Sequence, residues 1–473
     1  MQISYWIRNI HYVFTFTMLC VIISSAEVII MNSRFYILNL RIQGIKNIEK
    51  PIEISFYKKT INNDFNPDEY KIKGIYGENG SGKTAIILAV NIMRNIMIDK
   101  SYLSDSMNQK LLVESVNKKT MSGFIECEYY ISNDTEKLIY KYFISFEIRD
   151  DDRFYLINEK LECKNGNYSK NQYITLYETK DGVLTSLNNP ELLSEYKEKT
   201  QNLLTQRAFT TWVFENDFVS QNYNDSLIKG MVNVLLLCLS LVVSLDDADN
   251  HIMYFLNKRI GELDDDSLSE IKMDIINEIK NRIESVRNDE IMIPKSALDY
   301  YKSYINNLYR FVQIFKPELR AIDIDTKDHG EYYKGRIIMY YDDYSLDKEF
   351  ESRGIKKLIH LYDYLNNACN GYIVFIDELD SNINDVYLDK IIEHFAYYGK
   401  GQLCFTAHNL SPMSILKEYK NSISFISSIN TVHTWTRNGN QSPENAYKNG
   451  FIEDSPFNVD ASDFLGIIGG EYA

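Results

Sequence analysis

The sequence predicts an α/β fold, and three observations along the 473-residue chain point to it. A β-rich run at 70–76 leads into a glycine-containing loop, and a helical run follows from residue 84 to about 99. A second apolar run, 372–376, ends in two carboxylates, as a buried parallel strand does when it delivers polar side chains to its carboxyl end. Between these runs, four alternating segments separated by turn signals predict an antiparallel meander.

The loop that follows the first strand fits the pattern G-x-x-x-x-G-K-[ST] in full. Its residues are Gly77, Glu78, Asn79, Gly80, Ser81, Gly82, Lys83 and Thr84. The glycines let amide N–H groups surround a phosphate chain, and the helix N-terminus adds partial positive charge. We expect Lys83 to reach the β- and γ-phosphates and the Thr84 hydroxyl to ligate Mg²⁺. The strand and the helix on either side argue against a chance glycine turn. Because no N-K-x-D motif is present, ATP is the expected nucleotide.

Composition limits the class of protein. Hydrophobic content of 45% and charged content of 25% are globular values, and the length accommodates roughly two or three domains. A net charge of −15 argues against a broad nucleic-acid-binding surface but leaves a local basic groove open. The six cysteines are scattered without a C-x-x-C pair, so no metal cluster is expected and a cytosolic protein is favoured. Asp246, Asp247 and Asp249 fit a solvated helix cap better than a second metal site or a nuclease.

The first thirty residues are largely apolar between Tyr12 and Met31. Such a run is typical of a signal peptide or a membrane anchor, yet Glu27 interrupts it before it reaches full spanning length. Three explanations stay open, in order of preference: a start codon assigned too far upstream of Met31, a real N-terminal anchor, and a buried extension. We expect a cytoplasmic protein, with a membrane tether if residues 1–30 are translated.

Before the phosphate loop we expect strands at 35–48 and 52–56, and after the first helix a polar linker at 101–121. The meander is expected to follow at 124–131, 138–148, 154–163 and 173–178.

From 189 to about 317 the pattern becomes helical. The apolar run 231–245 is short for a membrane span and predicts a buried core helix. The segments 252–286 and 298–315 are amphipathic and charged, and they form either a solvated helical domain or a partner-binding arm.

Strand character returns at 318–324 and 337–341, and the run Ser352-Arg353-Gly354 then opens a helix. Taken alone, a serine at this place is a suitable N-cap.

Asp377 and Glu378 follow the apolar strand, and His408 follows a further strand at 403–406. We expect Asp377 to hold Mg²⁺ through water, Glu378 to position the attacking water and His408 to sense the γ-phosphate. The alternatives are a surface turn for the carboxylates and an ordinary histidine at a strand end. The phosphate loop upstream disfavours both, because open α/β sheets place ligands at this edge.

These motifs together resemble the ABC-type ATPases of the SMC, RecF and OLD group, which includes the double-strand-break repair ATPases. More closely, the chain resembles bacterial AAA-family ATP-binding proteins of the abortive-infection kind. The resemblance covers about Met31 to Val183 and Glu318 to Leu465. It rests on GENGSGKT, on ESRGIKKL as the signature, on IDELDSNIN as the Walker B strand and D-loop, and on FTAHN as the histidine switch.

The resemblance implies a P-loop NTPase head of the ABC type, built from two lobes with a helical insertion. Lobe I would span 31–188, the insertion 189–317 and lobe II 318–473, after an apolar extension at 1–30. Two heads would sandwich two ATP molecules as an ATP-dependent homodimer. Ser352 and Gly354 of one head would then contact the γ-phosphate held by Lys83 of the other.

The chain departs from the family pattern at several positions. Arg353 stands where ABC transporters have glycine, which suits this subgroup. Asn384 replaces a frequent aspartate, which puts the D-loop contact across the dimer in doubt. The switch reads Thr-Ala-His rather than Thr-Thr-His, and Gln206 is only a weak candidate for the Q-loop glutamine.

The resemblance implies a dimerising molecular switch that hydrolyses ATP and acts with a separate effector protein, since the chain ends too soon after lobe II for an appended Toprim nuclease. Relatives of this kind serve bacterial anti-phage defence. The alternative is a RecF-like or SMC-like DNA repair or maintenance ATPase that holds DNA between its heads. A membrane-tethered ATPase is a third possibility, and an exporter subunit is the least favoured.

Overall fold

The computed structural model describes ten stretches of the chain. They are residues 34–58, 60–62, 64–133, 136–168, 170–216, 226–245, 291–295, 298–330, 332–436 and 441–452. The predictions for the apolar segment 1–30, the acidic group at 246–249 and the helix at 252–286 lie outside these residues. Among the described residues, no helix combines the length and the apolar character needed to cross a membrane.

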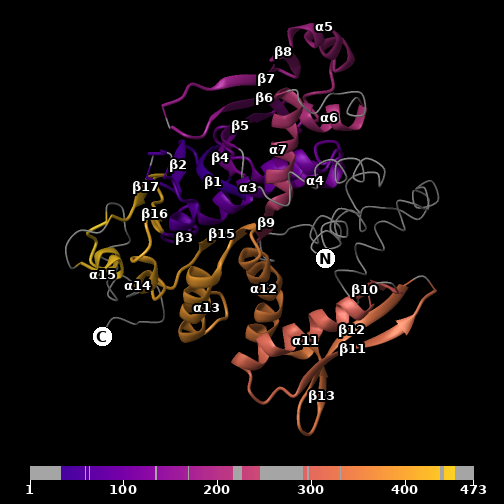
Figure 1. Ribbon diagram of the computed structural model, residues 1–473, viewed down its shortest axis with the longest axis vertical. Coiled ribbons are helices and arrows are strands. Elements are labelled where there is room, and N and C mark those ends of the chain that lie inside the picture. Colours follow the sequence, from indigo (N-terminus) through magenta and orange to yellow (C-terminus); the bar gives the residue numbers. More distant parts are fainter. Residues whose placement is uncertain are drawn as a thin grey trace, which may run out of the picture. The chain divides into compact units, whose positions relative to one another are not determined.

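The chain forms two compact units (Figure 1). The first consists of the described residues within Met1–His251, Asn367–Leu379 and Ile392–Ala473, and the second of those within Ile252–Asn366 and Asp380–Ile391. The first unit holds two sheets, and each unit is described by itself below.

A seven-stranded antiparallel sheet contains the predicted meander, which is confirmed. In the order β2-β1-β4-β5-β6-β7-β8, its strands are β2 (Ile52–Ser55), β1 (Arg34–Gln43), β4 (Ser122–Ser132), β5 (Lys137–Ile148), β6 (Phe154–Asn165), β7 (Ile174–Lys180) and β8 (Val183–Leu187). β8 was not predicted. β1 ends earlier than expected because Gly44 adopts φ +76°, which turns the chain over 44–48.

The linker expected at 101–121 contains a helix, α4 (Ser106–Ser115). The side chain of Asp105 caps this helix by accepting hydrogen bonds from the backbone N–H groups of Met107 and Asn108. The prediction of a linker overlooked this N-cap.

A six-stranded sheet carries the phosphate loop and is parallel apart from one edge strand. In the order β17-β16-β3-β15-β14-β9, its strands are β17 (Val432–Thr434), β16 (Ile423–Ile426), β3 (Ile72–Tyr76), β15 (Gln402–Thr406), β14 (Ile373–Ile376) and β9 (Leu241–Ser244). Every residue of β3, β14, β15 and β16 is buried, which explains why these segments lack an apolar–polar alternation.

Two helices, α3 (Lys83–Ile98) and α7 (Ser226–Ser240), pack against each other and against both sheets (Figure 1). α3 contacts β4 and β9, and α7 contacts β5, β7 and β9. The helix predicted at 231–245 therefore ends at Ser240. The next residues, rich in valine, form β9, which pairs in parallel with β14.

Shorter helices complete the first unit. They are the 3₁₀ helix η1 (Pro67–Tyr70), α5 (Pro190–Lys199), α6 (Phe209–Asn216), α14 (Met413–Leu416) and α15 (Pro443–Lys448). α5 packs on β8 and α6 contacts α3.

The second unit contains a four-stranded antiparallel sheet and helix α11 (Leu298–Phe315). The strands are β10 (Ile291–Pro294), β11 (Ala321–Asp328), β12 (Tyr332–Tyr340) and β13 (Ser345–Asp347), and the 3₁₀ helix η5 (Lys348–Phe350) follows them. The apolar face of α11, with Ile305, Leu308 and Val312 buried, packs on this sheet.

Two further helices run through both units: α12 (Arg353–Cys369) and α13 (Asp385–Tyr398) begin in the second unit and end in the first.

The segment 189–317, for which we expected a helical insertion, also contains strands. Helices α5, α6, α7 and α11 lie in this range, but so do β9 and β10, which belong to different sheets. A strand of four residues paired with a distant segment leaves no periodic signal of its own, so sequence pattern could not separate it from the neighbouring helix.

Candidate active site

The order of the parallel strands gathers the predicted catalytic residues at one edge. β15 lies between β3 and β14, with Thr406 opposite Ile75 and Phe405 opposite Ile376. The carboxyl ends of parallel strands meet at the same sheet edge. The phosphate loop after β3, Asp377 and Glu378 after β14, and His408 after β15 therefore share this edge, which we call the carboxyl edge.

The phosphate loop has a backbone that its glycines make possible. Gly80 and Gly82 adopt φ values of +78° and +109°, in the left-handed region that favours glycine. A Cβ atom on Gly77 would lie 2.2 Å from the carbonyl oxygen of Ile426, so only glycine fits there. Helix α3 begins after Gly82 without a side-chain cap, which leaves its first N–H groups for an anionic ligand.

Lys83 is buried, with 6% of its surface exposed. Its Nζ donates hydrogen bonds to the carbonyl oxygens of Gly77 at 2.8 Å and Glu78 at 3.0 Å. The ammonium group is therefore held inside the loop by two neutral acceptors, and a phosphate group would be a better, charge-assisted acceptor.

Ser81 is fully buried in the same loop, and its Oγ has no hydrogen-bond partner among the described residues. A buried hydroxyl without a partner is uncommon and calls for an explanation, which a phosphate oxygen would supply. The neighbouring Thr84 lies half-buried in the first turn of α3, while Glu78 is half-buried and Asn79 is exposed at the loop tip.

Asp377 is held at the end of β14 and is 1% exposed. Its Oδ1 accepts a hydrogen bond from the Thr406 hydroxyl at 2.5 Å, and its backbone N–H donates to the Ser244 carbonyl at 2.8 Å. Its Oδ2 is buried and has no hydrogen-bond partner among the described residues. A buried carboxylate oxygen in this state fits a cation or a cation-bound water.

Glu378 is oriented by the same threonine. Its backbone N–H donates to Thr406 Oγ1 at 2.8 Å, and its φ of +45° is unusual for a residue other than glycine. The Glu378 side chain is about one-third exposed, and its Oε1 lies 3.8 Å from His408 Nε2. Thr406 thus links the buried carboxylate of Asp377 to the backbone of the more accessible Glu378, which has His408 beside it.

A turn at 44–50 supports the phosphate loop, and sequence reasoning missed it. The Asn47 side chain donates a hydrogen bond to the Gly80 carbonyl oxygen, and a Cβ on Gly82 would lie 3.1 Å from Ile48 Cγ1. Asn47 is 33 residues from Gly80, so no local pattern could have signalled this contact.

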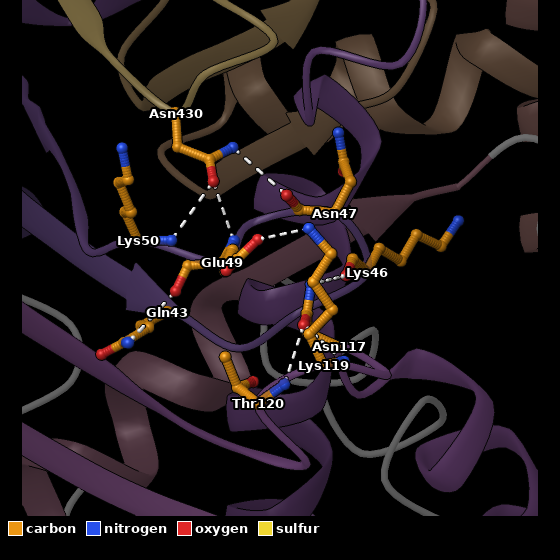
Figure 2. A network of polar contacts seen from close by, with 9 residues as sticks. All are labelled: Gln43, Lys46, Asn47, Glu49, Lys50, Asn117, Lys119, Thr120 and Asn430. Carbon is orange, nitrogen blue, oxygen red and sulfur yellow. Dashed lines mark hydrogen bonds and ion pairs between the residues drawn. The ribbon is translucent and has the colours of Figure 1, made fainter.

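Figure 2 shows how this turn is fixed. Asn430, in the loop before β17, donates to the Asn47 carbonyl at 3.2 Å and accepts from the N–H groups of Glu49 and Lys50 at 2.8 and 3.2 Å. On the other side, the Asn117 side chain donates to the Lys46 carbonyl at 2.7 Å. Two asparagines distant in sequence thus hold the turn that contacts the phosphate loop.

The signature residues belong to the second unit, whereas Lys83, Asp377, Glu378 and His408 belong to the first. Ser352 is exposed, and its Oγ accepts a hydrogen bond from the Ile355 N–H at 3.4 Å at the start of α12. A Cβ on Gly354 would lie 2.9 Å from the Asn382 carbonyl oxygen, so the signature and the D-loop lie against each other.

The structure shows what two residues do at positions where the sequence departs from the family pattern. Asn384 Oδ1 accepts from the Val386 N–H at 3.0 Å, so Asn384 acts in α13 as an N-terminal cap, a role that asparagine and aspartate share. Gln206 lies in the turn between α5 and α6, where its N–H donates to the Leu203 carbonyl.

No family model matches the chain, and no curated protein matches it. Among solved structures, an SMC head bound to the C-winged helix domain of ScpA aligns at 14% identity and a TM-score of 0.43, covering 87% of this chain and 99% of that chain. An SMC head domain from Thermotoga maritima aligns at 12% identity and a TM-score of 0.30, covering 85% and 99%. The site is therefore assigned from its own contacts.

Proposed function

We propose that the chain is an ATPase head of the ABC type, which binds Mg·ATP at the carboxyl edge and hydrolyses it within a dimer of heads. The observation that carries the proposal is the set of groups gathered at that edge. A buried lysine sits inside a glycine loop, a buried carboxylate has one oxygen without a hydrogen-bond partner among the described residues, and a second carboxylate lies beside a histidine. This is the set that in-line attack of water on a terminal phosphate requires.

Each group has a distinct task in the proposal. The N–H groups of the loop and Lys83 bind the phosphates and stabilise the charge that develops on the γ-phosphate. Glu378 accepts a proton from the attacking water or orients that water, because its carboxylate is accessible where that of Asp377 is buried. His408 orients the Glu378 carboxylate and responds to the state of the γ-phosphate.

The donor set at the edge fits Mg²⁺. The Thr84 hydroxyl and Asp377 Oδ2 are hard oxygen ligands, and Mg²⁺ keeps most of its waters when it binds beside a nucleotide. When bound, the cation neutralises phosphate charge.

The exposed position of Ser352 supports the dimer. Two large apolar side chains near it in the sequence and near the D-loop are also exposed: Phe350 at 77% and Val386 at 65%. Exposed apolar groups beside a serine and a glycine suit a surface that a second copy covers on binding ATP. Ser352 and Gly354 would then complete the site that Lys83 of the other head occupies.

The proposal extends to a cellular role through the family resemblance. Closure with ATP and reopening after hydrolysis would make the head dimer a cytoplasmic switch that signals to a separate effector protein in a bacterial defence system. The alternative is that the heads bind DNA at a local site. Stimulation of the ATPase rate by duplex DNA would favour this alternative.

The decisive experiment measures molar mass in solution with and without Mg·ATP on the Glu378→Gln protein. This substitution keeps the shape of the side chain and removes its basicity, so ATP should bind and persist, and turnover should fall roughly 10²- to 10⁴-fold. We expect the mass to double with Mg·ATP. Adding Ser352→Arg should abolish the doubling and leave ATP binding by each head intact.

A mass that stays constant in Mg·ATP would overturn the switch. Doubling that persists with Ser352→Arg would show that the signature is not part of the interface. Undiminished turnover in Glu378→Gln would show that Glu378 takes no part in the chemistry. His394→Ala, on the surface of α13, is a matched control for handling and folding.

A further inference from the structure

The residue before the signature serine carries a buried charge. The Glu351 side chain is 2% exposed, whereas the neighbouring Ser352 lies on the surface. A carboxylate in such a place needs several donors to remain ionised. The sequence gives no reason for a buried acid here, because a glutamate next to an exposed turn is ordinarily solvated.

Three donors converge on Glu351 from three segments of the second unit. Lys316, which follows α11, approaches Oε1 and Oε2 at 3.3 and 3.1 Å. The Tyr341 hydroxyl, just after β12, donates to Oε1, and the Ser352 N–H donates to Oε2 at 3.1 Å. Burial opposes ionisation of Glu351, but the hydrogen bonds from Tyr341, Lys316 and Ser352 outweigh it and lower the pKa of the carboxyl group.

The donors are themselves fixed. Lys316 Nζ lies 4.6 Å from the centre of the Tyr341 ring, and that ring stacks on Tyr344 at 4.6 Å. The backbone N–H of Lys316 donates to the Val312 carbonyl, which continues α11 to this lysine. Glu351 is therefore a junction at which the end of α11 and the turn after β12 meet the loop that presents Ser352.

We propose that Lys316, Tyr341 and Glu351 are positioning residues that set the backbone of Ser352 for contact with the nucleotide of the partner head. The proposal rests on the proposed function, because it gives these residues a task only if Ser352 acts across a dimer. Ser352 is exposed and lies directly before α12, so its direction depends on the backbone that Glu351 holds through the Ser352 N–H. α11, which ends at Phe315 directly before Lys316, thereby becomes the element through which the second unit influences hydrolysis.

The test uses mixed heads, so that damage to the signature can be separated from general damage. Heads carrying Lys83→Ala bind ATP weakly and lack the lysine that stabilises the γ-phosphate, and heads carrying Ser352→Arg cannot offer a signature. A dimer of one of each contains one complete site, made from Lys83 of the second head and Ser352 of the first. The ATPase rate of the mixture should therefore exceed that of either protein alone.

Lys316→Met is then placed in one head or the other. In the Lys83→Ala head it lies beside the Ser352 that serves the complete site, and we expect the rate of the mixture to fall roughly tenfold to a hundredfold, as misplaced catalytic groups do. In the Ser352→Arg head it lies beside a signature already disabled, and we expect no further loss. Tyr341→Phe, a milder change, should show the same asymmetry with a smaller effect, and Lys316→Arg should restore the rate.

The outcomes are distinguishable. A mixture of the two parent heads that is no more active than either alone overturns the proposed function, and the positioning role falls with it. An active mixture in which Lys316→Met has equal effects in both heads overturns the positioning role alone. ATP affinity of the separate heads, measured with a fluorescent ATP analogue, should be unchanged by Lys316→Met, whereas a folding defect would lower it.

Discussion

Two buried lysines at opposite ends of the same strand region make a useful comparison. Lys83 follows β3 at the carboxyl edge, and Lys73 lies near the start of β3, at the end we call the amino edge. Each donates to two backbone carbonyls: Lys83 to Gly77 and Glu78, and Lys73 to Ser55 and Asn421, both at 2.7 Å. Burial and donation to backbone carbonyls therefore do not separate the lysine that we propose to bind a ligand from a structural one.

The difference lies in the segments that supply the carbonyls. The partners of Lys83 belong to a glycine loop that also contains the buried Ser81 hydroxyl, which has no hydrogen-bond partner among the described residues. In the proposed function, phosphate oxygens replace these partners. The two partners of Lys73 are linked to each other, because the Asn421 side chain donates to the Ser55 carbonyl and also to the Tyr57 carbonyl. The comparison indicates that a phosphate-binding lysine differs from a structural one in having hydrogen-bond acceptors that a ligand can replace.

The largest expected effect is on the pH dependence of stability, compared between the native protein and Lys73→Met. Burial lowers the pKa of Lys73 to about 7 from an ordinary value of 10.5. Between these values the unfolded chain binds more protons than the folded one, so the stability of the native protein should rise with pH relative to the variant. The gain from pH 7 to pH 10 is at most about 4 kcal/mol.

Urea unfolding of both proteins across this pH range measures the difference. Parallel pH profiles of stability for the native protein and Lys73→Met would show that Lys73 keeps its charge in the folded state. The contrast between Lys73 and Lys83 would then fail. ATP affinity of Lys73→Met serves as the control and should match that of the native protein.

Lys83→Ala, by contrast, should change the affinity for ATP. Loss of one charge-assisted contact to phosphate should weaken ATP binding about tenfold to a hundredfold. Isothermal titration with ATP checks this expectation, and equal ATP affinity in the two proteins would break the comparison at the carboxyl edge.

A smaller effect is expected from a substitution at the carboxyl edge itself. Thr406→Val removes the hydroxyl that joins Asp377 Oδ1 to the Glu378 N–H. We expect kcat to fall about tenfold with little change in the ATP affinity of a single head, because the carboxylates and not the phosphates lose their support. Thr406→Ser keeps the hydroxyl and should restore the rate. An unchanged kcat in Thr406→Val would show that the link is not needed.

The sequence was most informative where a function demanded a fixed pattern. The phosphate loop, the apolar strand before Asp377 and the meander could be predicted because glycine spacing, burial on both faces and turn residues each leave a local signal. β9 could not be separated from α7, since a continuous apolar run is compatible with either structure.

The supporting contacts of the site escaped prediction for a different reason. Asn430 and Asn47 are 383 residues apart, and Lys316 and Glu351 are 35 residues apart. Single asparagines and lysines are common on any surface, and only the folded chain shows which of them are buried against a functional loop. The groups to which we assign the chemistry were therefore easier to predict than the groups that hold them.

The position of β3 between β15 and β16 has a consequence for synthesis on the ribosome. The phosphate loop emerges early, but its strand gains its neighbours only after residues 402–406 and 423–426 have been translated. At roughly 5–20 residues per second, this delay is on the order of tens of seconds. The meander, whose strands follow one another closely, has its partners much sooner. A nascent chain would therefore carry a formed β-sheet beside an unfinished candidate site until residues 423–426 had been translated.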